Sequence, residues 1–338
     1  MERGFIDRLP FPKLWLTLAI FALVLLSYLA CRALFGGGGA LLGPDRDTES
    51  LAELQVHAVI ALLIGYMLTH QLRARRELQR DLSALRPLLA DGAEVSAEEI
   101  FSAVARLPET IVTIAGGLFG VAIIPLFRGG AGFLPDQVGR EFDVVWSAGA
   151  NFALFAIMAR LAYTGLSVGA QLDERITRKI RIDLLDLGPL APYARRGLRS
   201  AMYWLLGSSI ASLLFLRFGF LWVHVFILIG TISVGLFAML QSLKGVHGRL
   251  EEEKRNELAV LRTAIRSARR DVLGDAPGAA DAAARLPGLL ALEARTEGVN
   301  TWPFDISTFL RFSALGLLAI GSWLGGAIIE RLLGLAVD

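Results

Sequence analysis

Long apolar runs alternate with charged segments along the 338-residue chain. A helix needs roughly 20 apolar residues to cross the hydrocarbon core of a bilayer, and several runs approach or exceed that length. We therefore predict an all-α, polytopic membrane protein with about seven transmembrane helices. The predicted spans are residues 14–31, 51–72, 110–127, 142–168, 200–216, 221–243 and 306–329.

Three of the predicted spans pass directly into charged sequence. Span 2 continues as RARRELQRDLSAL, and Pro87 disfavours helix at the residue before it. Span 4 continues as QLDERITRKIRIDLLDL, which stops at Gly188-Pro189. The longest such stretch, residues 220–273, joins an apolar span to HGRLEEEKRNELAVLRTAIRSARRDVL without a proline. We predict that spans 2, 4 and 6 extend as helices into the cytoplasm.

The extension of span 6 carries an apolar seam whose members lie three or four residues apart. This spacing is typical of a short coiled coil or a packed amphipathic helix. The seam begins on the order of 20 Å beyond the bilayer edge, out of register with the extension of span 2. We expect it to pack on the same helix of a second subunit or on another protein, and an Ala-, Gly- and Pro-rich linker follows at residues 274–288. The seam residues are Leu258, Leu261, Ile265, Ala268 and Val272.

Shorter patterns predict local structure between the spans. Ser96 and Glu99 have the spacing of a capping box, ahead of apolar residues within 100–107 that favour an amphipathic helix in the membrane interface. Pro108 suits the start of span 3. A weak repeat, D-L-x-x-L-x-P-L, occurs at residues 81–88 and 183–190. It favours one leading helix followed by three helical hairpins.

Lysine and arginine are concentrated on one side of the predicted spans. Residues 1–13, 73–109, 170–199 and 244–305 hold 26 of them, whereas the segments on the opposite side hold 5. By the positive-inside rule the basic side is cytoplasmic, so the N-terminus is inside and the C-terminus is expected outside. The expected units are residues 1–72 with spans 1 and 2, 73–109 as extension and interfacial helix, 110–168 with spans 3 and 4, 169–199 as basic helix and Pro turn, 200–243 with spans 5 and 6, 244–305 as coiled-coil-like helix and linker, and 306–338 with span 7 and tail.

Composition agrees with a protein of the bacterial inner membrane. Apolar residues make up 54% of the chain and the mean hydropathy is +0.54, which is too apolar for a water-soluble globule. The 34 basic residues nearly balance 32 acidic ones, so net charge indicates no nucleic-acid partner. Cytoplasmic arginines are expected to attract anionic lipid headgroups. Cys31 has no second cysteine with which to form an intrachain disulfide.

Polar residues inside span 4 are candidates for a transport pathway, because an unpaired charge in hydrocarbon is costly. Arg160 lies deepest, and Ser147 and Asn151 form a polar stripe on the same helix. These residues would line or gate a path for ions or small solutes. In the alternative interpretation, Arg160 reaches the inner headgroups or pairs with a carboxylate, and the stripe only forms hydrogen bonds between helices.

Arg32, Glu53 and His57 form a predicted charge cluster near the outer side. Arg32 ends span 1 and Glu53 opens span 2, so antiparallel packing would bring the opposite charges to the same depth. A structural ion pair is the simpler interpretation. His57, one turn deeper, would make the cluster proton-sensing if its imidazole titrates near neutral pH. Arg311, near the inner end of span 7, is expected to reach the headgroups.

Motifs for metal, nucleotide or hydrolytic chemistry are weak. H-E-x-x-H, C-x-x-C and G-x-x-x-x-G-K-[ST] do not occur, so we predict no metal site and no cofactor. Residues 165–169, around Ser167, match the G-x-S-x-G elbow of serine hydrolases, but that elbow requires a strand-to-helix turn. An intramembrane serine hydrolase is a remote alternative, and the sequence leans against an enzyme.

Two functional classes fit these patterns. The first is an oligomeric channel or transporter, favoured by the polarity of span 4, whose helical extensions transmit a cytoplasmic signal. The second is a non-enzymatic scaffold or sensor that presents its cytoplasmic helices to a partner protein. Small-residue pairs, such as Gly116 with Gly120 and Gly207 with Ala211, predict close helix packing within or between subunits. A homo-oligomer is therefore expected.

Overall fold

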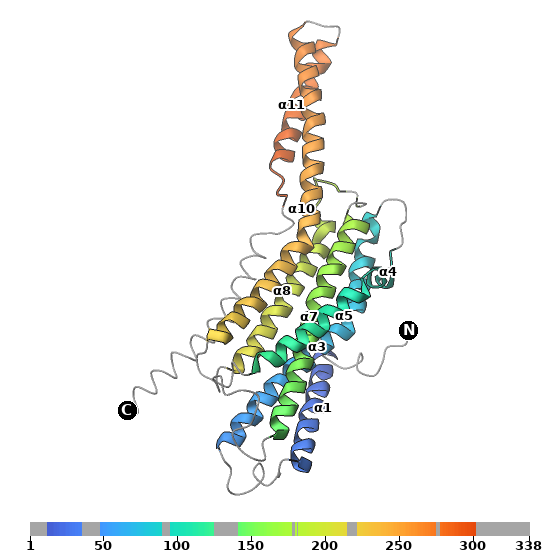
Figure 1. Ribbon diagram of the computed structural model, residues 1–338. Helices are drawn as coiled ribbons and strands as arrows, with labels where there is room; N and C mark the ends of the chain where they lie inside the picture. The colour runs from blue at the N-terminus through green and yellow to red at the C-terminus, as the bar shows by residue number, and fades with distance from the viewer. Residues whose placement is uncertain are drawn as a thin grey trace, which may run out of the picture.

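The computed structural model describes residues 12–35, 48–89, 95–124, 141–177, 180, 182–214, 222–274 and 278–301 (Figure 1). These residues form helices, and their only β contact is an isolated antiparallel bridge between Leu89 and Ile180. The all-α prediction is confirmed. The elements are α1 (Pro12–Phe35), α3 (Thr48–Leu85), η2 (Arg86–Leu88), α4 (Ala97–Ser102), α5 (Arg106–Ala122), α7 (Glu141–Arg175), η5 (Gly188–Leu190), α8 (Ala191–Ala211), η6 (Ser212–Leu214), α10 (Trp222–Leu273) and α11 (Ala279–Glu297).

Six of the predicted spans fall on described helices. Three helices are long and apolar enough to cross a bilayer, over Pro12–Leu34, Leu54–Leu88 and Val144–Arg175. Helices α5, α8 and α10 overlap the predicted spans 3, 5 and 6. Span 7 at residues 306–329, with Arg311, lies outside the described residues. The chain is therefore all-helical, with three described helices suited to a membrane.

Sequence neighbours pair as antiparallel helices to build the bundle: α1 with α3, α5 with α7, and α8 with α10 (Figure 1). Helix α3 also packs on α7 and α8 and so joins the pairs. Apolar side chains from α3, α7 and α8 fill the core between them, including Ile60, Ile64, Leu154, Phe155 and Trp204. This arrangement places the C-terminal end of α3 beside the N-terminal ends of α1 and α8.

Helices α5 and α7 approach closely at two glycines. A Cβ atom at Gly120 would lie 2.6 Å from the carbonyl oxygen of Asn151, and one at Gly116 would lie 2.9 Å from that of Phe155. Because neither glycine has a side chain, the α5 backbone can rest directly on α7. The predicted close packing is confirmed within one subunit at this pair.

A second apolar core lies where α3 and α7 leave the main bundle. Helix α3 continues to Leu85, which confirms the helical extension of span 2. Leu82 and Leu85 pack there with Ile100 of α4, Ile176 after α7, and Val246 of α10. The extensions of spans 2 and 4 therefore form a compact layer instead of separate helical arms.

The predicted helix through residue 187 is wrong, because α7 ends at Arg175. Beyond it, the carboxylate of Asp183 accepts a hydrogen bond from the backbone N–H of Leu185 at 2.8 Å, and that of Asp186 accepts one from Gly188 at 3.0 Å. Such local bonds compete with helix formation. In both copies of the weak repeat the proline lies in a 3-10 turn, η2 or η5, but the preceding residues are helical only in the first.

The N-cap role of Ser96 in the predicted capping box is confirmed at the start of α4. The Ser96 hydroxyl accepts a hydrogen bond from the backbone N–H of Glu99 at 3.2 Å. This helix ends at Ser102 and is shorter than predicted. Helix α5 begins at Arg106, so Pro108 lies in its first turn, where a missing N–H is tolerated.

Helix α10 is a single helix of 52 residues, which confirms that the apolar span and its charged extension are continuous. Its C-terminal half forms a hairpin with α11 that projects beyond the bundle (Figure 1). The linker prediction for residues 274–288 is wrong in its second part, because α11 begins at Ala279 and contains Pro287. Alanine has the highest helix propensity of all residues, and this offsets the proline.

The seam of α10 has a partner within the same chain. Leu261 is 7% exposed, whereas the neighbouring Val260 is 70% exposed, and the other seam residues are half-buried. Arg262 Nε donates a hydrogen bond to Glu293 Oε1 of α11 at 2.8 Å. Lys254 Nζ donates to the carbonyl oxygen of Glu297 at 2.7 Å. The prediction of a second subunit or another protein here followed from the register of the seam relative to the extension of span 2, and the linker predicted at residues 274–288 hid the start of α11.

Candidate functional site

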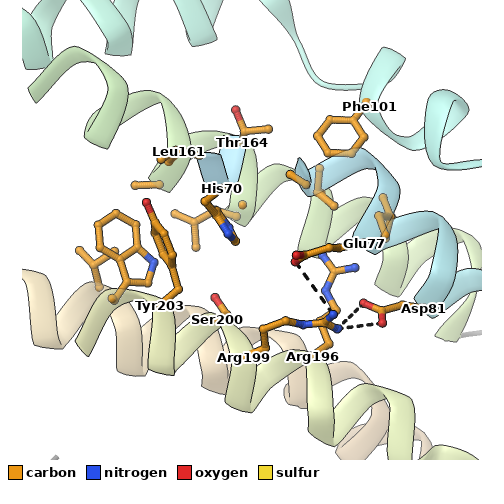
Figure 2. Close-up of a pocket in the computed structure, with 18 residues that line it drawn as sticks. His70, Glu77, Asp81, Phe101, Leu161, Thr164, Arg196, Arg199, Ser200 and Tyr203 are labelled. Carbon is orange, nitrogen blue, oxygen red and sulfur yellow. Dashed lines mark hydrogen bonds and ion pairs between the residues drawn. The ribbon is translucent and has the colours of Figure 1, made fainter. Parts of the chain in front are cut away.

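A cavity of about 130 Å³ lies between α3, α7 and α8 and is completed by Phe101 of α4 and Val234 of α10 (Figure 2). One end is charged, with Glu77, Asp81, Arg196 and Arg199. The other end is mainly apolar and holds Tyr203 and Leu161, with the lining residue Trp204 in ring contact with Tyr203 at 5.6 Å between centroids. The cavity thus combines a charged and an apolar end in one partly open space.

Two acidic residues on α3 are held by basic residues from other helices. Arg199 Nη2 donates to both carboxylate oxygens of Asp81, at 2.8 Å each, and Arg199 Nη1 lies 4.0 Å from Glu77 Oε2. Lys13 of α1 forms an ion pair with Glu77. A guanidinium that contacts both oxygens of a carboxylate fixes the orientation of both groups. These contacts lock α1, α3 and α8 together at the charged end of the cavity.

Arg196 is the cation that these carboxylates leave unpaired. It lines the cavity one helical turn before Arg199 and makes no hydrogen bond or ion pair with any residue that the structure describes. Burial lowers the pKa of Arg196 to about 10, while the negative charge of Asp81 raises it and so opposes this shift. The guanidinium therefore keeps its proton at neutral pH. When Lys13, which pairs with Glu77 from outside the cavity lining, is counted, three cations face two carboxylates and leave an excess of one positive charge.

Tyr203 lines the cavity and has a buried hydroxyl without a hydrogen-bond partner among the described residues. Its ring is stacked on Tyr66 with 4.9 Å between ring centroids and on His70 with 3.9 Å, so the side chain is fixed. Tyr203 is 8% exposed, and its hydroxyl has no hydrogen-bond partner within the described part of the chain. A buried polar group without a partner costs free energy. A ligand that brought an acceptor to this hydroxyl would remove that cost.

Sequence reasoning missed this cavity. The charged residues of α3 and α8 follow or precede predicted spans, and they were interpreted as part of solvated basic segments. A signal was present, since Glu77 and Asp81 lie four residues apart and Arg196 and Arg199 lie three apart, so each pair shares a helix face. Periodicity could not indicate that these two faces meet.

The pathway candidates on α7 are engaged by neighbouring groups. Arg160 Nε donates to Glu109 Oε1 of α5 at 2.7 Å, with the Arg160 side chain 48% exposed. Asn151 donates to the carbonyl oxygen of Ser147 in its own helix at 2.9 Å. Nine residues of helix separate Asn151 from Arg160, about 14 Å along the axis. The structure does not bring these residues to one cavity.

The predicted outer cluster is partly described. His57 Nε2 lies 3.0 Å from the hydroxyl oxygen of Ser147, and its ring is stacked on Tyr28 with 4.2 Å between centroids. Arg32 Nη1 donates to the Tyr28 hydroxyl at 2.6 Å. The side chain of Glu53 lies outside the described residues. Arg32 and His57 are therefore in one buried cluster with Ser147, while the ion pair with Glu53 and proton sensing stay predictions.

Other chemistry finds little support in the described residues. They contain no group of three or more His, Cys, Asp or Glu that could hold a metal ion. Ser167 lies within the continuous helix α7, so residues 165–169 do not form the strand-to-helix turn of a hydrolase elbow.

Comparison of the sequence with protein-family models, and comparisons with curated proteins and with solved structures, find no match for this chain. The geometry of the chain itself therefore provides the argument for function.

Proposed function

We propose that this chain is a non-enzymatic membrane scaffold, whose bundle anchors the α10–α11 hairpin and presents it to a cytoplasmic partner protein. The observation that supports this proposal is the continuity of α10 from the bundle to the tip of the hairpin. A helix without a break transmits position and orientation, whereas a flexible linker would lose both.

The length of α10 supports a hairpin that reaches well beyond the membrane. At 1.5 Å per residue, its 52 residues extend about 78 Å. The hydrocarbon core takes up roughly 30 Å of that length. About 48 Å is left for the headgroup region and the cytoplasm.

Exposed apolar side chains also support the placement of the bundle in a membrane. Large apolar side chains are exposed on α1, α5 and α10, including Leu23, Leu118 and Phe237. Lipid chains would cover these side chains in a bilayer. We further propose seven crossings of the bacterial inner membrane, with the N-terminus in the cytoplasm and the C-terminus outside, because basic residues lie mainly in the segments assigned to the inside.

The hairpin itself has features of a contact surface. Val260 of α10 and Leu290 of α11 are 70% and 47% exposed. The buried core of a protein interface is more apolar than its rim, and these two side chains would lie in that core. The predicted seam is covered by α11, so these outward residues replace it as the proposed contact with the partner.

A conduit for ions or small solutes is the second candidate. The charged cavity between α3, α7 and α8 is the observation that favours it. The contacts of Arg160, Ser147 and Asn151 with protein groups favour the scaffold, since residues that line a path face water.

Site-specific photo-crosslinking in native membranes tests the scaffold. A photoreactive residue at Val260 should give an adduct with a second protein, while the same residue at Leu118, exposed at 60% on α5, should not. Ion flux should be absent from liposomes that contain the purified protein. An absence of hairpin adducts together with ion flux would overturn the scaffold in favour of the conduit. An adduct of only twice the chain mass would also overturn it and would indicate self-association.

A further inference from the structure

We propose that the cavity between α3, α7 and α8 binds the headgroup of an anionic phospholipid, with the phosphate at Arg196 and an ester carbonyl at the Tyr203 hydroxyl. The proposal is independent of the scaffold function, because it concerns a site inside the bundle and not the hairpin. It assigns a ligand to a cavity that the proposed contact with a partner does not use.

The excess positive charge selects an anion. Asp81 and Glu77 are already paired with Arg199 and Lys13, so Arg196 forms no ion pair of its own with a residue that the structure describes, and the nearby Asp81 is shared with Arg199. A guanidinium can form two parallel hydrogen bonds to phosphate oxygens. A phosphate would thus balance the charge and provide acceptors for the free donors of Arg196.

The unpaired Tyr203 hydroxyl selects a ligand larger than phosphate. It lies toward the apolar end of the cavity, away from the charged residues (Figure 2). A free phosphate ion at Arg196 would leave this donor unpaired. In a phospholipid, ester carbonyl oxygens follow the phosphate along the glycerol backbone, so one molecule can serve both positions.

The size and depth of the cavity fit a headgroup. About 130 Å³ approaches the 150 Å³ of an engineered cavity that binds benzene, and it suits a phosphate with part of its glycerol. The lining residues lie around the predicted inner ends of spans 51–72 and 200–216, where headgroups are found. Basic pockets between membrane helices on the cytoplasmic side are known to hold such headgroups.

The apolar end gives the acyl chains a route to the bilayer. Leu161, Trp204 and Val234 line the cavity beside Tyr203. On α8, Met202 and Leu206, which are close in sequence to the lining residues Tyr203 and Trp204, are exposed. The acyl chains would lie along this face of α8, while the headgroup stays inside.

Lipid binding to the full chain in detergent tests the proposal. Native mass spectrometry would compare phosphatidylglycerol with phosphatidylcholine of the same acyl chains, and inorganic phosphate would be added as a competitor. We expect phosphatidylglycerol to bind best, Arg196→Gln to weaken it about tenfold, and phosphate to compete poorly. Arg195→Gln is the matched control, because Arg195 is exposed, adjacent in sequence and not part of the cavity lining.

Tyr203→Phe keeps the test decisive if Arg196→Gln does not fold. Removing an unpaired buried hydroxyl should leave the lipid-free protein as stable as the parent or more stable, yet weaken phosphatidylglycerol binding severalfold. Opposite effects on stability and on binding are not expected from a purely structural residue. Equal losses in Arg195→Gln and Arg196→Gln would overturn the site, and so would unchanged binding in Tyr203→Phe. If phosphate competed at concentrations similar to those of the lipid, the assignment of a phospholipid would be wrong, and the site would bind a free anion.

Discussion

Arg160 of α7 and Glu109 of α5 form an ion pair, with 2.7 Å between Nε and Oε1. The pair joins the middle of α7 to the first turn of α5. It gives the charge most deeply placed in span 4 a carboxylate partner, and negative charge in the first turn of α5 also interacts favourably with the helix dipole. A packing role for Arg160 therefore explains its position without a transport path.

The Arg160–Glu109 pair should contribute little to stability. Arg160 is 48% exposed, and exposed ion pairs contribute about 0.2–1 kcal/mol. A double-mutant cycle of Arg160→Ala and Glu109→Ala, read as the free energy of unfolding in detergent, should give a coupling in that range. The same cycle with Glu98→Ala, an exposed carboxylate on α4, should give none. A loss of ion flux in Arg160→Ala liposomes, with unchanged stability, would contradict the packing role.

The sequence predicted those parts of the fold that depend on local pattern. The apolar runs predicted the positions of the long helices, the capping box predicted the start of α4, and the continuity of α10 followed from the absence of proline between residues 220 and 273. The predicted secondary structure was wrong where burial in the tertiary structure outweighs the local preference for helix. Ile180 and Leu184 follow α7 as non-helical residues because they fill the second core, which a one-dimensional pattern does not contain.

The cavity could not be predicted, for a related reason. Asp81 and Arg199 lie 118 residues apart in the sequence, and their hydrogen bonds depend on the packing of α3 against α8. Charge patterns within each helix indicate a polar face but not its partner. The outer cluster was partly predictable, because Arg32 and His57 occupy ends of consecutive spans, whereas Tyr28 and Trp146 had no signal of their own in the sequence.

Gly120→Ala should destabilise the protein by about 1–3 kcal/mol, since the added methyl group would press on the Asn151 carbonyl and separate α5 from α7. Gly149→Ala is the matched control on α7. Nothing lies within 4 Å of a Cβ atom there, and the better helix propensity of alanine should make the variant neutral or stabilising by up to about 1 kcal/mol. Thermal unfolding in detergent measures both variants. Equal Tm values for Gly120→Ala and the parent would contradict the close contact.

Ser147→Ala should lower the free energy of unfolding by about 1–3 kcal/mol, because it removes a hydrogen-bond partner from the buried imidazole of His57. Asn151→Ala should cost less, since its amide bonds only to a carbonyl of its own helix. Comparing the stabilities of the two variants distinguishes a polar stripe that packs against protein from one that lines a path for ions. If both variants kept the parent's stability but altered ion flux, the stripe would face water instead of protein.

The α10–α11 hairpin gives a prediction from two adjacent residues. Leu261→Asp should open the hairpin, because it places a carboxylate at a position that is 7% exposed and packed against α11. Val260→Asp adds the same charge at a 70% exposed position and should leave the hairpin closed. The Arg262–Glu293 ion pair cannot hold the hairpin alone, since it is exposed and therefore weak.

Hydrogen exchange of the α11 amides in the full chain measures this opening. We expect exchange throughout α11 to be much faster in Leu261→Asp than in the parent, with little change in the bundle helices α1 and α3. A closed hairpin in both variants would show that the contact at Leu261 is not what holds α11. Faster exchange in Val260→Asp as well would indicate that charge at the hairpin surface, and not burial of the seam, controls its stability. Opening of the hairpin in Leu261→Asp alone would show that α11 of the same chain buries the apolar seam of α10. The outward face of the hairpin would then be left for a partner protein.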